Sequence, residues 1–300
     1  MSVSTSESQL SFARPGGVRT VKNGLATVFV TLATVLAVIP LFWVLITVIT
    51  KGVRLILSST WWLQSQRGIT PRRDGGGAYH AIVGTVEMAL ICAAIAVPLG
   101  IMGAILLIEY AKGTKVARGV SFMVDILSGI PSIVAALFIY ALFITIFGLG
   151  RSAIAVSLSL VLLMLPVVLR STEEMLKLVP QELREASYAL GVAKWKTILK
   201  VVIPTAFSGI VTGVMLGLAR VMGETAPLLI LVSYAVGINF SPTSDTMGAL
   251  PTMINSGRDQ PPQMPGYERV WAAALTLILI VMLLNLLARG IARASKLKER

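Results

Sequence analysis

Six apolar stretches, each long enough to cross a lipid bilayer, constrain the fold of this chain more than any other feature. They occupy residues 24–50, 81–108, 120–147, 152–169, 205–232 and 270–288. About 20 helical residues cross the ~30 Å hydrocarbon core of a bilayer. A helix also satisfies its own backbone hydrogen bonds where no water is present. We therefore expect an all-α, polytopic membrane protein with six transmembrane helices.

The composition agrees with a membrane protein and excludes a soluble domain. Of the 300 residues, 55% are hydrophobic and 13% are charged, and the mean hydropathy is +0.83. The net charge of +12 does not indicate a nucleic-acid partner, because most basic residues flank the apolar stretches. Six spans put both termini on one side, which holds 17 of the 26 lysines and arginines against 8 on the other. The positive-inside rule therefore predicts that both termini are cytoplasmic.

The polar segments divide the chain into four parts. We expect an N-terminal tail, a first transmembrane helix with its outer loop, a transmembrane core and a C-terminal tail, at residues 1–23, 24–70, 71–290 and 291–300. Both tails are predicted to be cytoplasmic. The third apolar stretch contains a helix breaker, Ser-Gly-Ile-Pro-Ser, at residues 128–132.

Two charges, Arg220 and Glu224, lie inside the fifth apolar stretch. A charge in hydrocarbon costs about 2.5–3.5 kcal/mol on insertion scales, so both need a reason to be there. On one continuous helix they share a sector of about 80° with Gly209, Gly213 and Gly217. Small residues let membrane helices approach closely. We therefore expect both charges on a helix-packing face, either as a polar site on a substrate path or as a buried ion pair that aids assembly.

Three further charged residues lie in or beside the apolar stretches. Glu87 is expected near the outer side and Asp125 near the inner side, and both are explained most simply as interfacial or packing groups. Glu87 is nevertheless a candidate for the substrate path. Arg170, which follows the fourth stretch, is another candidate.

The sequence carries no catalytic constellation that would make it an enzyme. It has no GxxxxGK[ST] phosphate loop, no cluster of metal ligands and no nucleophile beside a base. We expect neither a metal nor a cofactor in this chain. If ATP drives transport, a separate subunit must hydrolyse it.

The loop between the fourth and fifth stretches has a distinctive spacing. Glu185-Ala186-Ser187 is followed by three residues and Gly191, then by nine residues and Val-x-Ile-Pro ending at Pro204. This resembles the EAA loop of ABC importer permeases (EAA, three residues, Gly, nine residues, I-x-L-P), with conservative replacements. In that family the loop docks on a cytoplasmic ATPase. The resemblance implies a type I ABC importer permease fold, a coupling loop at residues 182–204 and these five residues as its coupling residues.

The side chains of this loop fit a docking role. Gly191 permits a sharp turn between two helical pieces. We expect a polar exterior from Glu182, Arg184, Lys194, Lys196 and Lys200. We expect an apolar docking face from Ala186, Ala189, Leu190 and Trp195.

Three other segments, residues 75–85, 125–138 and 219–229, narrow the resemblance to the PstA family of phosphate-importer permeases, over about residues 71–290. In that family the Arg and Glu that correspond to Arg220 and Glu224 are implicated in phosphate passage. The resemblance implies a multi-pass protein of the bacterial inner membrane. Its implied partners are a PstC-like second permease, a PstB-like ATPase dimer that uses ATP and Mg, and an extracytoplasmic PstS-like phosphate-binding protein.

Other readings stay open at this point. An ABC permease for another oxyanion, such as sulfate or molybdate, would share the loop. An ion-coupled secondary transporter would use Glu87, Asp125 and Glu224 as proton carriers. A structural membrane scaffold would tolerate neutral residues in place of Arg220 and Glu224.

Overall fold

The computed structural model describes residues 17–298 of the chain. These residues form helices and loops without a named strand, and a single β-bridge pairs Ser233 with Thr246. Within this described part, five helices are long and apolar enough to cross a membrane, and a bent helix pair makes six if its two pieces are counted as one span. The predicted all-α membrane fold is therefore confirmed.

The chain divides into two units, residues 1–47 and residues 48–300. In the first unit, residues 17–47 are helical and form most of α1 (Gly17–Ile56), which contains Pro40. The candidate span within α1 runs from Arg19 to Ile56, and its most apolar window has a mean hydropathy of 2.7, as suits a helix in lipid.

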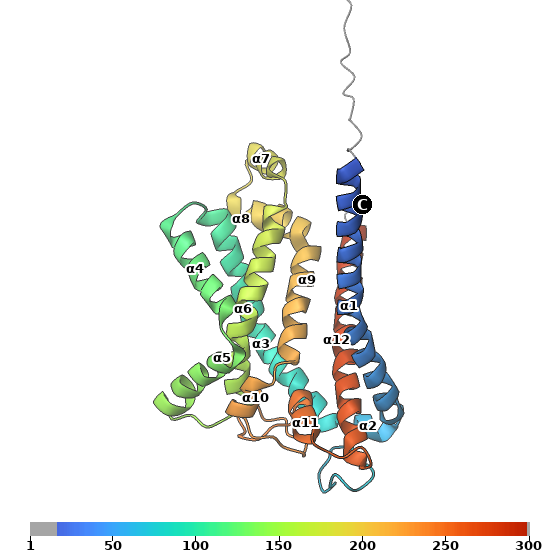
Figure 1. Ribbon diagram of the computed structural model, residues 1–300. Coiled ribbons are helices and arrows are strands. Elements are labelled where there is room, and N and C mark those ends of the chain that lie inside the picture. The colour runs from blue at the N-terminus through green and yellow to red at the C-terminus, as the bar shows by residue number, and fades with distance from the viewer. Residues whose placement is uncertain (1–16, 299–300) are drawn as a thin grey trace, which may run out of the picture. The chain divides into compact units, whose positions relative to one another are not determined.

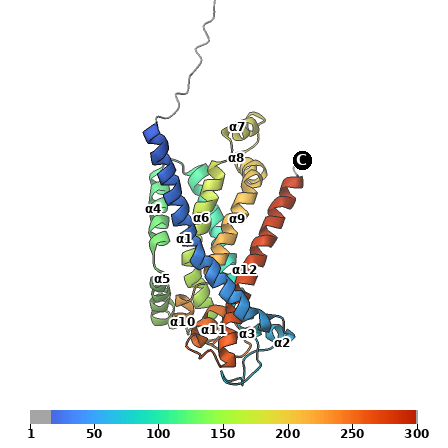
Figure 2. The same ribbon diagram turned by 45° about the vertical axis from the view of Figure 1, so that its right-hand side comes forward.

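The second unit is built on long helices that run alongside one another (Figure 1, Figure 2). They are α3 (Tyr79–Ile105), α6 (Ala153–Lys177), α9 (Ile203–Met222) and α12 (Pro265–Lys298). The central helix is α6, which packs against both α3 and α9. In its most apolar window 67% of the residues are buried. The helices approach closely because α3 has a glycine at the contact: a Cβ on Gly100 would lie 2.8 Å from Val168 Cγ1 of α6.

Short elements join or extend these helices. The short α-helices are α2 (Ser59–Leu63), α7 (Gln181–Ala189), α8 (Lys194–Thr197), α10 (Ala226–Leu231) and α11 (Leu250–Gly257). Among residues 17–298 there are three π-helical turns, η1 (Leu106–Tyr110), η2 (Tyr140–Ile146) and η3 (Ile198–Val202). Together, α3 and η1 form the second span, Tyr79–Tyr110.

The third span is broken rather than straight. It consists of α4 (Lys115–Gly129) and α5 (Ser132–Ile139), the latter extended by η2. The chain direction bends by 106° between the two pieces. Ile130 is extended, with φ −72° and ψ 127°. Pro131 favours this conformation in the preceding residue and cannot donate to a helical hydrogen bond. The breaker seen in the sequence is thus the corner of this span.

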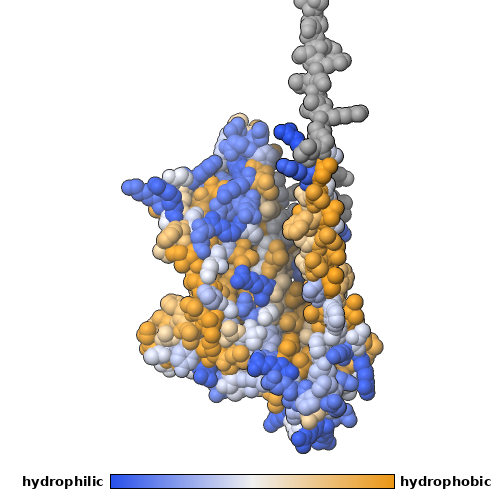
Figure 3. Space-filling model, viewed as in Figure 1, coloured by the Kyte–Doolittle hydropathy of each residue, from blue (hydrophilic) through white to orange (hydrophobic). Residues whose placement is uncertain are grey.

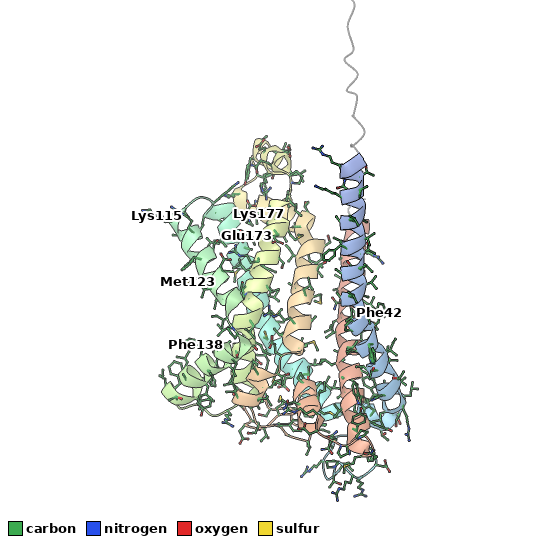
Figure 4. The ribbon with its side chains drawn as sticks, in the orientation of Figure 1. Phe42, Lys115, Met123, Phe138, Glu173 and Lys177 are labelled. Carbon is green, nitrogen blue, oxygen red and sulfur yellow. The ribbon has the colours of Figure 1, made fainter. Side chains whose placement is uncertain are left out.

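The two ends of the second unit differ in what they carry. One end carries α7 and α8, and the other carries α2 and α11 (Figure 1); we call them the α7 end and the α11 end. On the face drawn in Figure 3, hydrophilic surface gathers over α7 and over the loops of the α11 end. Exposed apolar side chains such as Met123 of α4 and Phe138 of α5 point outward between them (Figure 4), as expected for a surface in contact with lipid.

Side-chain hydrogen bonds hold the loops of the α11 end on the helices. Arg269 of α12 donates to the carbonyl oxygens of Thr70 at 2.9 Å and Pro71 at 3.1 Å. The Thr85 hydroxyl of α3 accepts a 2.8 Å hydrogen bond from the backbone N–H of Leu250. The loops at this end are therefore anchored to α12 and α3.

Candidate functional site

The glycine face of α9 packs against α6. A Cβ on Gly209 would lie 2.1 Å from Met175 Sδ, and one on Gly213 would lie 1.9 Å from Ser171 Oγ. A Cβ on Gly217 would lie 3.2 Å from Met164 Cγ. Because glycine has no Cβ, the two helices approach more closely than larger residues would allow.

Arg220 and Glu224 do not lie on one helix, which corrects the expectation from the sequence. Helix α9 ends at Met222, Gly223 is its C-cap, and Glu224 lies in the break before α10. Arg220 Nε is 3.8 Å from Glu224 Oε1. The two charges form a pair across a helix end rather than one turn apart on a continuous helix.

The two side chains of this pair differ in exposure. The Arg220 side chain is 49% exposed and that of Glu224 is 18% exposed. Among residues 17–298, no side chain or carbonyl is hydrogen bonded to the Arg220 guanidinium. It therefore has N–H donors free for an oxyanion, for which the planar guanidinium is well suited.

The structure does not bring Arg170 to this pair. Arg170 Nη2 donates to Asp125 Oδ1 at 2.5 Å, and Nη1 donates to Glu173 Oε2 at 2.6 Å. Ser171, the neighbour of Arg170 on α6, packs against Gly213 of α9. Gly213 precedes Arg220 by seven residues, which is about 10 Å along the axis of α9. Two carboxylates already occupy the Arg170 guanidinium.

Arg170 belongs to a chain of ion pairs along a large groove. Lys177 Nζ donates to Glu173 Oε1 at 2.8 Å and continues the chain toward the α7 end, where Figure 4 labels both residues. The groove has a volume of about 1310 Å³ and is lined from α4, η1, α6, α7 and α8. The network joins α4 to α6, so Asp125 acts as a packing partner in this conformation.

Glu87 is separate from both groups. It lies about two turns into α3, in the half nearer the α11 end, and is partly buried. Within the part of the chain that the structure describes, no hydrogen bond or ion pair joins Glu87 to Arg220 or Glu224.

The coupling loop consists of two short helices with a turn between them. Helices α7 and α8 flank Gly191, whose φ of +74° is favourable only for glycine. Glu185 and Ala186 are exposed on α7, whereas Ser187 is buried and its hydroxyl is 2.8 Å from that of Thr197. Pro204 lies in the first turn of α9, directly after the π-helical turn η3, so its missing N–H falls where the helix changes its hydrogen-bond pattern.

The predicted docking face is exposed. Leu190 is 84% exposed and Trp195 is 55% exposed, and Ala186 and Ala189 are exposed as well. These apolar side chains are therefore accessible for contact with another protein.

One residue of the predicted polar exterior is instead buried. Arg184 is only 8% exposed, and its Nε and Nη2 donate to Glu109 Oε1 at 3.1 and 2.8 Å. Its Nη1 also donates to the carbonyl oxygen of Val179 at 2.7 Å. The expectation of a solvated Arg184 is wrong, because the carboxylate of η1 and the carbonyl groups at the end of α6 surround it. Glu109 lies 75 positions before Arg184. The sequence did not predict it as a partner, because no local pattern reveals a contact over such a distance.

Membrane-spanning helices, a polar loop of two short helices on one end and an arginine–glutamate pair at a helix break are features of a transport permease. Residues 96–297 match the family described as binding-protein-dependent transport system inner membrane component, and the chain belongs to that family. Within it, similar curated proteins include phosphate transport system permeases. The PstA 1 phosphate transport system permease protein of Mycobacterium tuberculosis (strain ATCC 25618 / H37Rv) is 52% identical over 90% of this chain and 87% of that protein. PstA of Yersinia pestis is 38% identical over 90% of each chain.

Solved structures agree on the fold. A chain of the MetNI methionine ABC transporter, in an inward-facing conformation, superposes with a TM-score of 0.59, covering 72% of this chain and 94% of that chain at 23% identity. A bacterial ABC transporter for alginate also gives a TM-score of 0.59, covering 92% and 99% of the two chains at 14% identity. The predicted type I ABC importer permease fold and the resemblance to PstA are thus confirmed.

Proposed function

We propose that this chain is the membrane-spanning permease subunit of an ATP-driven phosphate importer. The observation that carries this function is the 52% identity with a phosphate transport permease over 90% of the chain. The exposed coupling loop supports it, because the loop offers a docking surface for an ATP-binding subunit. Arg220 supports it as well, because its free N–H donors can bind an anion.

Arg220 and Glu224 are proposed to act on phosphate together. Phosphate near neutral pH is an anion, and moving it through hydrocarbon unaided has a prohibitive cost. The Arg220 guanidinium presents N–H donors with a geometry that suits a tetrahedral oxyanion. Glu224, 3.8 Å away, competes for the same charge and weakens the binding of phosphate enough for release. A transporter needs this balance, since cargo held too tightly does not move on.

The other predicted residues have supporting roles in this proposal. Gly209, Gly213 and Gly217 set the spacing between α9 and α6 that positions Arg220. Glu87 and Arg170 lie apart from the Arg220–Glu224 pair in this conformation, so a contact with phosphate would occur at another stage of its passage.

The proposed assembly has four kinds of component. A second permease completes the path, a dimer of ATP-binding subunits docks on the coupling loop, and an extracytoplasmic protein delivers phosphate. The chain is not itself an enzyme: ATP and Mg act in the ATP-binding subunits, and this chain requires no cofactor. It lies in the bacterial inner membrane with both termini cytoplasmic, which puts the α7 end in the cytoplasm with the ATPase.

Uptake of labelled phosphate, with labelled sulfate as the control, tests this function. Cells that lack this chain and other phosphate importers receive the wild-type chain or Glu185→Lys. We expect wild type alone to restore phosphate uptake, to leave sulfate uptake unchanged, and to lose activity on ATP depletion. Restored uptake that survives ATP depletion but stops with a protonophore would contradict the proposal, as would restored sulfate uptake alone.

A further inference from the structure

Both halves of the coupling loop are attached to one residue of the second span, Glu109. From α7, Arg184 donates to the Glu109 carboxylate. From α8, the Lys194 ammonium donates to the backbone carbonyl oxygen of Glu109 and lies 4.9 Å from the centre of the Tyr110 ring. The loop therefore has a common attachment to η1, the π-helical turn that ends the span.

The Arg184 guanidinium joins three segments at once. Besides the Glu109 carboxylate, it donates to the carbonyl oxygens of Leu176 at 3.0 Å and Val179 at 2.7 Å. Leu176 lies in the last turn of α6, and Val179 lies just after the helix ends. Its planar geometry fixes the directions of these hydrogen bonds. The end of α6, the end of the second span and α7 thus share one rigid junction.

The Glu109–Arg184 pair is buried, with side-chain exposures of 5% and 9%. Removing two charges from water is costly, and apolar residues of similar size often give equal stability. The benefit of such a pair is directional: it fixes one arrangement of the segments it joins. Its place in a π-helical turn fits this view, because these turns occur frequently at functional sites.

The two arms of the loop are also linked to each other. The Ser187 and Thr197 hydroxyls are 2.8 Å apart and both residues are buried. The turn at Gly191 is therefore bridged across its base. A force on the exposed face of α7 or α8 reaches Glu109 through both arms.

The second span continues from this junction to the other end of the unit. From Glu109 to Thr85 it covers about 36 Å at 1.5 Å per residue. At Thr85 it accepts the hydrogen bond from the N–H of Leu250, in α11. Next to it, a Cβ on Gly84 would lie 2.0 Å from the carbonyl oxygen of Gly248, so the backbones are in direct contact. One helix therefore connects the coupling loop with the loops of the α11 end.

We propose that Glu109 and Arg184 form the joint through which the coupling loop moves the second span, with Lys194 as a second tether. Both members of the pair are positioning residues that act on transport through the helix. This inference rests on the proposed function, because it requires an ATPase that acts on the loop. It predicts that loosening the joint separates ATP hydrolysis from phosphate movement.

The test uses the complete complex in liposomes and measures phosphate transported per ATP hydrolysed. The variants are Glu109→Gln, which keeps the shape of the side chain and removes its charge, and Lys194→Met, which removes the exposed second tether. Glu174→Gln is the matched control, since this exposed carboxylate of α6 has no ion-pair partner among residues 17–298. Subunit ratios in the purified complexes report assembly.

We expect Glu109→Gln to keep ATP hydrolysis within about twofold of wild type and to lower phosphate per ATP by about fivefold or more. Lys194→Met should lower this ratio less, and Glu174→Gln should leave it unchanged. An unchanged ratio in Glu109→Gln, or equal losses of hydrolysis and transport, would overturn the inference. If Glu109→Gln does not assemble, an unchanged ratio in Lys194→Met overturns it. A wild-type complex that hydrolyses ATP without moving phosphate would instead contradict the proposed function.

Discussion

Arg220 Nε lies 3.8 Å from Glu224 Oε1, on the far side of a helix end. Two other arginines of the chain are held much more tightly: Arg184 lies 2.8 Å from Glu109, and Arg170 lies 2.5 Å from Asp125. A separation of 3.8 Å exceeds hydrogen-bond length, so the Glu224 carboxylate attracts the Arg220 guanidinium without occupying its donors. Of these three arginines, Arg220 alone is free to exchange one anion for another.

Replacing Arg220 by glutamine should remove this contact with phosphate. A hydrogen bond to a charged group contributes about 1.5–3 kcal/mol, so we expect phosphate uptake to fall roughly tenfold to a hundredfold. Arg220→Lys, which keeps the charge but loses the planar set of donors, should retain more activity. Initial rates of labelled phosphate uptake at matched protein levels measure both. Wild-type uptake in an assembled Arg220→Gln complex would exclude a role for this guanidinium.

Glu224→Gln should have a different kinetic effect from Arg220→Gln. Without the competing carboxylate, Arg220 binds phosphate more tightly and releases it more slowly. A partly exposed ion pair contributes up to about 1 kcal/mol, which corresponds to a decrease in KM of about fivefold or less. We therefore expect both KM and maximal uptake rate to decrease. An increase in KM would show that Glu224 helps to bind phosphate rather than to release it.

Gly84→Ala should destabilise the protein, whereas Gly119→Ala should not. A Cβ at Gly84 would lie 2.0 Å from the carbonyl oxygen of Gly248, and overpacking of this kind costs about 1–3 kcal/mol. Gly119, inside α4, has nothing beyond its own stretch of helix backbone within 4 Å of the added Cβ, and alanine favours a helix by about 0.5–1 kcal/mol. Thermal unfolding in detergent should show a lower midpoint for the first variant and an equal or higher one for the second. Equal midpoints would mean that the backbones separate without cost.

Leu190→Asp should weaken the attachment of the ATP-binding subunit. Leu190 is 84% exposed on the coupling loop, and burying a leucine contributes about 1.5–3 kcal/mol to binding. We expect the variant to fold normally and to lose most of the co-purified ATPase. Leu63→Asp is the control, since Leu63 is 72% exposed at the α11 end. A similar loss of ATPase in both variants would point to a general defect in assembly.

The spans were predictable because bilayer thickness and hydropathy are local properties of the sequence. The end of α9 was also marked locally: Gly223 and Pro227 are the stop and start signals that separate α9 from α10. The prediction that Arg220 and Glu224 lie on one continuous helix was wrong because these two signals end the helix between them. The bend in the third span follows in the same way from Pro131 and the extended residue before it.

The partners of the coupling loop were not predictable in this way. The charge of Arg184 suggested a solvated side chain, yet its carboxylate lies on another helix 75 positions away. Similarly, Arg170 binds Asp125 across 45 positions. Such contacts depend on how the spans pack against one another. Hydropathy contains no information about which arginine pairs with which carboxylate.

The bent third span also affects how the chain fits its bilayer. The 15 residues of α4 extend about 22 Å, short of a hydrocarbon layer about 30 Å thick, and α5 then turns away by 106°. Neither piece alone matches this thickness, so we expect a local hydrophobic mismatch beside α4 and α5. Lipids with shorter acyl chains relieve such a mismatch and longer ones increase it. The thickness of the membrane should therefore affect the free energy of this protein mainly at the bend between α4 and α5.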